Sequence, residues 1–135
     1  MRLAVADADA LIAIVHDRDY NHKKALAIND KLSHGGVIIV FPNTAIIEAM
    51  TTLKRALNLP DKSELVNKKY QQGAFEIEYV NESIQMLSSK IYEKARSKKN
   101  TAFDAIVAAC AEKLGAESIF SFDSWYTKLG FSLAG

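Results

Sequence analysis

The sequence predicts an α/β domain whose mostly parallel sheet is covered by helices. Short apolar runs alternate with longer segments of helical periodicity along the whole chain, which is the order of elements in βαβ folds. The run Val37–Phe41 is apolar throughout and rich in β-branched residues, as in parallel strands that are buried on both faces. No linker or internal repeat divides the 135 residues, so we expect one domain.

The first part of the chain is predicted to contain two strands, each followed by two helices. The strands cover residues 2–6 and 37–41, and the helices cover residues 8–16, 20–33, 43–59 and 61–72. Apolar residues at helical spacing and end signals predict the helices. Asn43 or Thr44 is the expected N-cap of the third helix. Asp61 and Glu64 form an approximate capping box for the fourth helix.

The second part of the chain is predicted to add two strands and two long helices. The elements cover residues 75–79, 81–99, 102–114, 118–121 and a short segment 125–129. Apolar and acidic residues alternate in the first of these, which predicts an edge strand with one solvated face. Thr101 is the expected N-cap of the second long helix, which ends at Gly115 and buries Phe103 among its apolar residues.

The composition excludes several classes of protein. Apolar residues make up 49% of the chain and charged residues 24%, which excludes disordered and low-complexity proteins. Seventeen Lys and Arg oppose sixteen Asp and Glu, so the chain is not a strongly basic nucleic-acid-binding protein. We find no secretory signal and no membrane span, and expect a cytoplasmic protein. The single Cys110 excludes a disulfide framework and is expected to be buried and inert.

Four acidic residues are expected at one edge of the sheet. Asp7 follows the first strand, and Asp123 follows the last. Asp104 lies three positions after Thr101, and Glu48 lies in the second turn of the helix after the second strand. Ligands of open parallel sheets bind beyond the carboxyl ends of the strands, so these carboxylates are candidates for a common site. Each also has a structural interpretation, as a capping-box, turn or solvated helix residue.

Carboxylates that lie close together require positive charge or protons. Two unit charges ~4 Å apart repel by about 4 kcal/mol at an effective dielectric constant near 20. Hard oxygen ligands without His or Cys favour Mg²⁺ or Mn²⁺ over zinc. Such an ion, held by carboxylates and water, suits phosphoryl chemistry.

Four segments resemble the motifs of PIN-domain nucleases, in the order found in that family. They are Val5–Ile12, Phe41–Glu48, Thr101–Ala111 and Ile119–Asp123. The resemblance covers nearly the whole chain. It implies a PIN-like domain over residues 1–135, with a mostly parallel four- to five-stranded sheet flanked by helices in three layers. It also places His22 at a structural position after the first helix.

The resemblance also implies a site and a reaction, the hydrolysis of single-stranded RNA. The residues expected to bind one or two Mg²⁺ or Mn²⁺ ions are Asp7, Glu48, Asp104 and Asp123. Ser121 would orient a metal-bound water or a carboxylate. Asp9 stands where the family more often has Asn, Ser or Thr, so it is either an outer acid or the N-cap of the first helix.

The resemblance extends to partners. Many small proteins of the family resemble toxins of type II toxin–antitoxin pairs, which implies a homodimer inhibited by a small antitoxin. The Arg and Gly that often follow the second-motif Glu in those toxins are missing here.

Basic and aromatic residues are candidates for contacts with RNA. The basic candidates are Arg96, Lys98, Lys54 and Arg55. The alternative for the cations before the Asp104 helix is that they complement the dipole of their own helix. Trp125 and Tyr126 either stack on a base or cover the core or a dimer face.

Two other functions fit the same residues. Asp7-Ala8-Asp9 resembles the nucleophile and acid/base pair of haloacid-dehalogenase-like phosphatases, with Asp7 as the nucleophile, although Leu11 departs from that motif. In a non-catalytic interaction module, by contrast, the acids would only cap helices. Divalent cations would then leave the stability of the protein unchanged.

Overall fold

A four-stranded parallel sheet organises the chain in the computed structural model, which describes residues 1–135. The strands are β1 (Leu3–Ala6), β2 (Ile38–Pro42), β3 (Glu76–Glu78) and β4 (Ser118–Phe120). The helices are α1 (Ala8–Val15), α2 (His22–His34), α3 (Asn43–Thr51), α4 (Pro60–Gln71), α5 (Glu82–Tyr92), α6 (Ala102–Leu114) and α7 (Trp125–Lys128). A short π-helix, η1 (Thr52–Ala56), directly follows α3.

The strand order is β3-β2-β1-β4, which places β1 inside the sheet and β3 at an edge, as the alternating pattern of residues 75–79 predicts. Val5 of β1 pairs with Val40 of β2 on one side and with Ile119 of β4 on the other. All strand pairs are parallel. The carboxyl ends of the strands therefore meet at one edge of the sheet.

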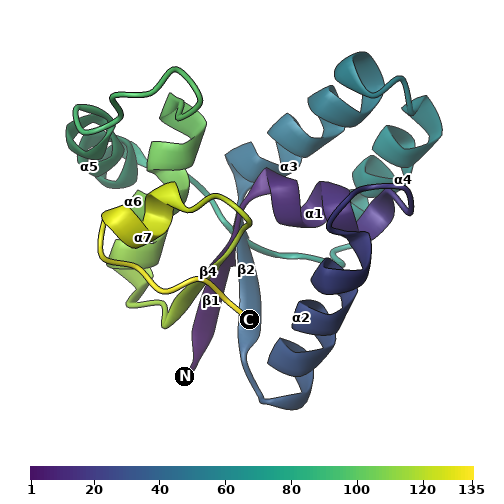
Figure 1. The fold of residues 1–135 in the computed structure, drawn as a ribbon, viewed down its shortest axis with the longest axis horizontal. Coiled ribbons are helices and arrows are strands. Elements are labelled where there is room, and N and C mark those ends of the chain that lie inside the picture. Colours follow the sequence, from purple (N-terminus) through teal and green to yellow (C-terminus); the bar gives the residue numbers. More distant parts are fainter.

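Helices cover both faces of the sheet, so the domain has the three layers that the sequence predicts (Figure 1). In β1, Ala4 and Ala6 belong to one apolar core with residues of α1, α2, α3 and α4. Val5 points the other way and belongs to a second core with residues of α5, α6 and α7. This alternation is the two-residue period of a strand buried on both faces.

Burial of β2 is less complete than predicted. Its carboxyl-terminal half is buried, but Ile38 is 37% exposed. The neighbouring β3 pairs only with Val40, Phe41 and Pro42. The first half of β2 therefore lacks a neighbouring strand on that side.

The predicted caps of two helices are wrong. The N-cap of α3 is Pro42, and the Asn43 side chain instead accepts a hydrogen bond from the Val80 backbone N–H at 2.8 Å. Helix α4 has no side-chain cap and begins at Pro60, whose missing N–H needs no partner at a first helical position. The capping box expected from Asp61 and Glu64 is therefore not formed.

The helix predicted over residues 81–99 ends at Tyr92. Asn81 caps its start by accepting from the Ile84 backbone N–H at 2.9 Å. After Tyr92 the chain is almost entirely polar, so a helix there would have little apolar surface to bury. Phe103, predicted to be buried, is 43% exposed. It lies in the first turn of α6, whereas residues 107–111 farther along the helix are buried on every side.

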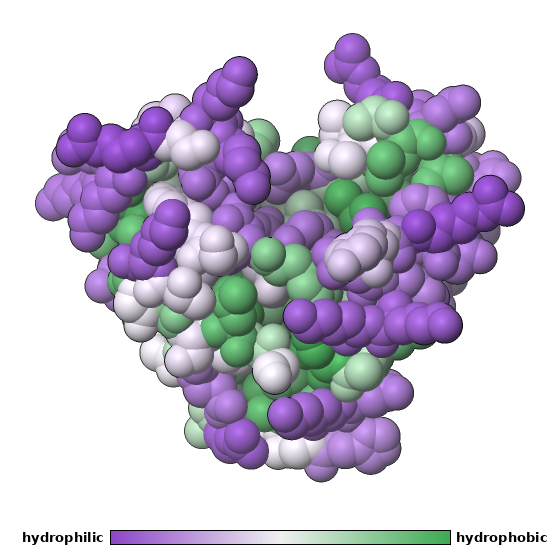
Figure 2. Space-filling view, in the orientation of Figure 1, coloured by the Kyte–Doolittle hydropathy of each residue, from purple (hydrophilic) through white to green (hydrophobic).

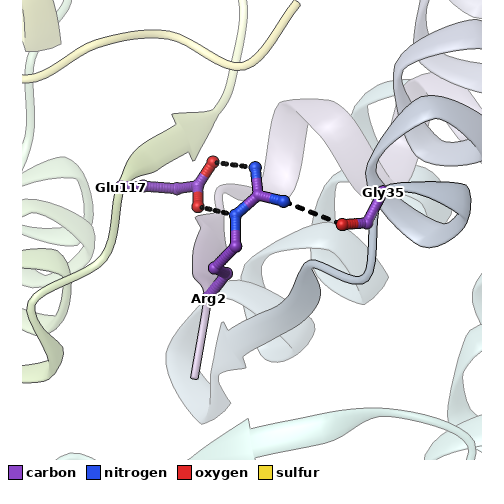
Figure 3. A network of polar contacts seen from close by, with 3 residues as sticks. All are labelled: Arg2, Gly35 and Glu117. Carbon is purple, nitrogen blue, oxygen red and sulfur yellow. Dashed lines mark hydrogen bonds and ion pairs between the residues drawn. The ribbon is translucent and has the colours of Figure 1, made fainter.

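A polar network joins three segments at the amino end of the sheet (Figure 3). The Arg2 guanidinium donates to the two carboxylate oxygens of Glu117 at 2.8 and 3.1 Å, and to the Gly35 carbonyl at 2.8 Å. Gly35 is the C-cap residue of α2, and Glu117 directly precedes β4. The Arg2–Glu117 pair is the only ion pair in the structure. Its side chains are largely exposed, so solvent screens it.

Candidate metal-binding acidic site

The ends of β1 and β4 lie side by side at the carboxyl edge of the sheet. Ala6 pairs with Phe120, and the Asp7 backbone N–H donates to the Phe120 carbonyl at 3.1 Å. Asp7 therefore leaves the sheet next to Ser121, and it is also the N-cap of α1. Figure 2 shows the surface hollowed at this end of the molecule, with hydrophilic residues along much of the hollow.

Asp7 is buried, with 4% of its surface exposed, and both of its oxygens accept hydrogen bonds. Oδ1 accepts from the Ala8 backbone N–H at 2.6 Å, and Oδ2 accepts from the Tyr126 hydroxyl at 2.6 Å. Tyr126 is fully buried and Trp125 is 7% exposed. Neither ring is free to stack on a base. Both side chains instead cover the core, which is the second of the two roles considered for them.

Asp9 connects α1 to the segment after β4. Its Oδ2 accepts from the Ser121 hydroxyl at 2.9 Å and from the Phe122 backbone N–H at 2.8 Å. Its Oδ1 is buried and has no hydrogen-bond partner. The N-cap of α1 is Asp7, so the N-cap interpretation of Asp9 is wrong. Ser121 accordingly contacts a carboxylate, that of Asp9.

Glu48 and Asp104 are contributed by α3 and α6. Glu48 Oε1 is buried without a hydrogen-bond partner, although the residue as a whole is only half-buried. Asp104 Oδ2 accepts from the Thr101 backbone N–H at 2.9 Å, as in a capping box. The capping interpretation of Asp104 is therefore correct, and the same residue also lies near the other acids.

Asp123 is held at the start of α7. Its Oδ1 accepts from the Trp125 backbone N–H at 2.9 Å, and its Oδ2 accepts from the Asn100 amide at 2.8 Å. Its own backbone N–H donates to the Ser121 hydroxyl at 3.1 Å. Asp123 is thus a turn residue whose side chain also ties this turn to the loop before α6.

Burial and mutual repulsion make several of these acids hold protons more tightly than usual. Burial raises the pKa of Asp7 well above its ordinary value, and the charge of Asp9 raises it further, while the Tyr126 hydrogen bond opposes the rise. Burial, then the charges of Asp104 and Asp9, raise the pKa of Glu48 from 4.5 to about 7. Burial likewise raises the pKa of Asp104, with a contribution from the Asp123 charge.

The same balance acts on Asp9. Burial raises its pKa and the charge of Asp123 adds to the rise, while hydrogen bonds from Phe122 and Ser121 oppose it. The five carboxylates therefore lie within electrostatic range of one another. No cation of the protein forms an ion pair with any of them.

These residues fit a divalent cation, although they are not already arranged as its ligands. No three Asp, Glu, His or Cys side chains converge on one point where an ion could bind. Asp7, Asp104 and Asp123 each accept hydrogen bonds from donors of the protein. Two buried carboxylate oxygens, on Asp9 and Glu48, still lack any partner. Unpaired hard oxygen atoms in a buried acidic cluster are the donors that Mg²⁺ and Mn²⁺ prefer.

The basic residues expected to contact RNA lie in two exposed segments at this end of the molecule (Figure 1). Arg96 and Lys98 lie in the loop between α5 and α6. They follow the end of the shortened α5, so they do not complement the dipole of its last turn. Lys54 and Arg55 lie in η1.

Sequence reasoning missed two contacts that shape the site. The Tyr126 hydroxyl binds Asp7, and the Asn100 amide binds Asp123. The partners are 119 and 23 residues apart in the chain, so no local spacing signals either pair. The polar end of an aromatic residue three positions after Asp123 is the one available hint.

Other predicted features lie away from the acids. Cys110 is fully buried, and burial raises the pKa of its thiol to about 12, as expected of an inert cysteine. His22 Nδ1 lies 2.6 Å from the Ala13 carbonyl, which fits a structural position. None of the helices has the length and apolar character needed to cross a membrane.

Comparison with known proteins identifies the family. No curated protein matches the chain by sequence. Among solved structures, the fold is similar to that of Mycobacterium tuberculosis VapC20, a sarcin-ricin loop cleaving toxin, with a TM-score of 0.79 and 16% identity over 96% of this chain and 95% of that one. It is also similar to FitAcB from Neisseria gonorrhoeae, with a TM-score of 0.70 and 16% identity over 98% and 96%. The PIN domain family model matches residues 4–131, and the chain therefore belongs to the PIN domain family, which indicates a nuclease.

Proposed function

We propose that this protein is a Mg²⁺- or Mn²⁺-dependent endoribonuclease that hydrolyses phosphodiester bonds of single-stranded RNA. The observation that supports this most directly is the uncompensated acidic cluster at the carboxyl edge of the sheet. Burial and the neighbouring negative charges raise the pKa values of Asp7, Asp9, Glu48 and Asp104, and two buried carboxylate oxygens have no partner. The only ion pair of the protein lies at the opposite end of the strands. A divalent cation would supply the missing positive charge.

The donor set favours magnesium or manganese because it consists of carboxylate oxygens and contains no His or Cys. The residues that would hold the ion are Asp7, Glu48, Asp104 and Asp123. When bound, the ion neutralises phosphodiester charge and makes a water molecule more acidic.

Asp9 and Glu48 have further roles in the site. The Ser121 hydroxyl and the Phe122 backbone N–H hold Oδ2 of Asp9, and its unpartnered Oδ1 would be available to the ion as a further ligand. Before an ion binds, Glu48 has a pKa of about 7, so near neutral pH it would release a proton when its carboxylate binds the ion.

The RNA backbone would be held by the basic segments on either side of the acids. The loop between α5 and α6 lies on one side of the carboxyl ends of the strands, and the segment after α3 lies on the other (Figure 1). The loop contains Arg96 and Lys98, and the segment after α3 contains Lys54 and Arg55. Removing a cation that binds a phosphate should weaken RNA binding and reduce its dependence on salt. Replacing Arg96 and Lys98 by Ala should therefore raise KM for a single-stranded RNA while leaving kcat nearly unchanged. An unaltered KM would remove this segment from the RNA-binding surface.

We further propose that the protein is the toxin of a toxin–antitoxin pair, cytoplasmic and homodimeric, with a small protein antitoxin. Support comes from its similarity in fold to VapC20 and FitAcB. A surface groove of about 390 Å³, lined mainly by apolar residues of α1, β2 and α4, leaves room for a partner. A neighbouring reading frame for a short DNA-binding protein, whose product co-purifies with this chain and blocks cleavage, is the expected observation. A chain that purifies alone beside unrelated genes would contradict the toxin assignment.

Replacing Asp7 tests the nuclease proposal. The wild-type protein should cleave single-stranded RNA only with Mg²⁺ or Mn²⁺, and a cation at a hundredfold excess over Kd should stabilise it by about 2.7 kcal/mol. Asp7→Asn should lose both effects and stay folded. Asp30→Asn, an exposed position on α2, should retain both.

Three results would contradict the proposal in different ways. Full cleavage by the Asp7→Asn variant would exclude the mechanism. A covalent acyl-phosphate on Asp7 would indicate a phosphatase. If neither cation stabilises the wild-type protein, the remaining interpretation is a non-catalytic interaction module whose acids only cap helices.

A further inference from the structure

Tyr126 carries the largest fully buried side chain in the protein, yet it ends in a polar atom. Its hydroxyl lies 2.6 Å from Asp7 Oδ2 and 3.4 Å from the Asp104 carbonyl oxygen. A phenol has one proton to donate, and the shorter distance assigns that proton to Asp7. Tyr126 is the only side chain that donates a hydrogen bond to this carboxylate.

Packing alone does not require the hydroxyl. The ring lies in an apolar core with Val5, Ile119 and Trp125, where a phenylalanine would fill nearly the same space. A buried hydroxyl needs a partner, and here that partner is a member of the acidic cluster. The oxygen atom, rather than the ring, is therefore the feature that calls for a functional explanation.

The position of the hydroxyl is fixed by the fold and not by a mobile loop. The Tyr126 carbonyl accepts from the Phe131 backbone N–H at 3.1 Å. The start of α7 is held by the Asp123 carboxylate, which accepts from the Trp125 backbone N–H at 2.9 Å. The donor that meets Asp7 thus belongs to the buried side of a short helix whose start and end are both hydrogen-bonded, as is common for positioning groups at metal sites.

We propose that Tyr126 is a positioning residue, whose buried hydroxyl restrains the Asp7 carboxylate within the acidic cluster and thereby strengthens its binding to a divalent cation. The proposal rests on the proposed function, because it requires that Asp7 be a ligand. Oδ2 is restrained by the phenol and Oδ1 by the Ala8 backbone N–H, so the carboxylate cannot rotate freely. A carboxylate whose rotation is already restrained loses less conformational freedom when it binds an ion.

The test is Tyr126→Phe, with Tyr70→Phe as the matched control. The Tyr70 hydroxyl is also hydrogen-bonded, to Tyr79 at 2.6 Å, but at the exposed surface. Isothermal titration with Mn²⁺ gives the dissociation constant, and thermal unfolding without metal gives the stability. We expect Tyr126→Phe to stay folded and to bind Mn²⁺ about tenfold more weakly or worse, as loss of an outer hydrogen-bond partner commonly does. RNA cleavage at subsaturating Mn²⁺ should fall in parallel and recover with added Mn²⁺. The Tyr70→Phe protein should bind Mn²⁺ and cleave RNA as the wild type does.

A Tyr126→Phe protein that is less stable but binds Mn²⁺ as tightly as the wild type, or more tightly, overturns the proposal and leaves a structural role. Wild-type protein that binds no Mn²⁺ overturns the proposed function itself, which is a distinct result. If Tyr126→Phe does not fold, wild-type protein with ¹³C-labelled tyrosine replaces it. The Cζ resonance of Tyr126 should shift on titration with Mg²⁺ while that of Tyr70 does not. A Tyr126 resonance that Mg²⁺ leaves in place overturns the proposal.

Discussion

Replacing Glu48 by Gln should make the metal-free protein more stable at pH 8. In the folded protein, burial and the neighbouring acids raise the pKa of Glu48 from 4.5 to about 7. Between these two pH values the folded state binds more protons than the unfolded state, so stability falls as pH rises. The stabilising effect of the proton is complete below about pH 4.5 and lost above about pH 7. Gln carries no charge at any pH and avoids that loss.

The expected gain in stability follows from the shift in the pKa of Glu48. A rise from 4.5 to about 7 corresponds to at most about 3.4 kcal/mol. Glu48 is only half-buried, so solvent screening reduces this value, and we expect about 1.5 kcal/mol. For a domain of this size, that difference raises Tm by roughly 5 °C.

Thermal and urea unfolding in EDTA, at pH 8 and pH 4.5, measure the effect. The Glu48→Gln protein should be more stable to unfolding than the wild type at pH 8 and equally stable at pH 4.5. Glu64→Gln, at an exposed position of α4, should stay within about 0.5 kcal/mol of the wild type at both. A Glu48→Gln protein that is no more stable than the wild type at pH 8, or equally stabilised at pH 4.5, would refute the electrostatic argument.

Other predictions concern protons, packing and the thiol. Mn²⁺ should bind more tightly as pH rises from 6 to 8, because binding displaces protons, including that of Glu48 with its pKa of about 7. Calorimetry in buffers of different ionisation enthalpy measures how many protons are released. A release of zero protons would contradict this prediction. Leu53→Ala, in the fully buried part of η1, should cost about 2–5 kcal/mol in urea unfolding, against less than about 1 kcal/mol for the more exposed Leu57→Ala. The Cys110 thiol, with a pKa of about 12, should not react with a disulfide reagent at pH 8 until the protein unfolds.

The parts of the fold that local patterns specify were predictable. Apolar runs located three strands and an alternating pattern located β3, and Asp7 could be placed at the carboxyl edge because it directly follows β1. The Thr101 and Asp104 capping pair is likewise a local signal, and it formed as predicted. In each of these, the residues that decide the structure lie within a few positions of one another.

The parts that the sequence did not reveal depend on distant partners. Asn43 is a reasonable N-cap for α3 by its position in the sequence. Its side chain instead accepts a hydrogen bond from the Val80 backbone N–H, 37 residues away. Helix α5 ends at Tyr92 because the following residues have little apolar surface to bury, although their composition alone permits a helix. The Tyr126 hydroxyl finds Asp7 across 119 residues. Such pairings require the folded sheet before they can be recognised.

The net charge of +1 conceals a strong asymmetry along the strands. At the amino end, Arg2 and Glu117 neutralise each other in the one ion pair of the protein. At the carboxyl end, Asp7 and its neighbouring acids have only hydrogen bonds from neutral donors, and burial keeps solvent from screening their repulsion. A sequence selected for stability alone would place a cation there, or replace an acid by an amide. Because the unfavourable arrangement is confined to one end, and because that end is where parallel sheets bind ligands, it supports our proposal that these acids bind a dication in addition to capping helices.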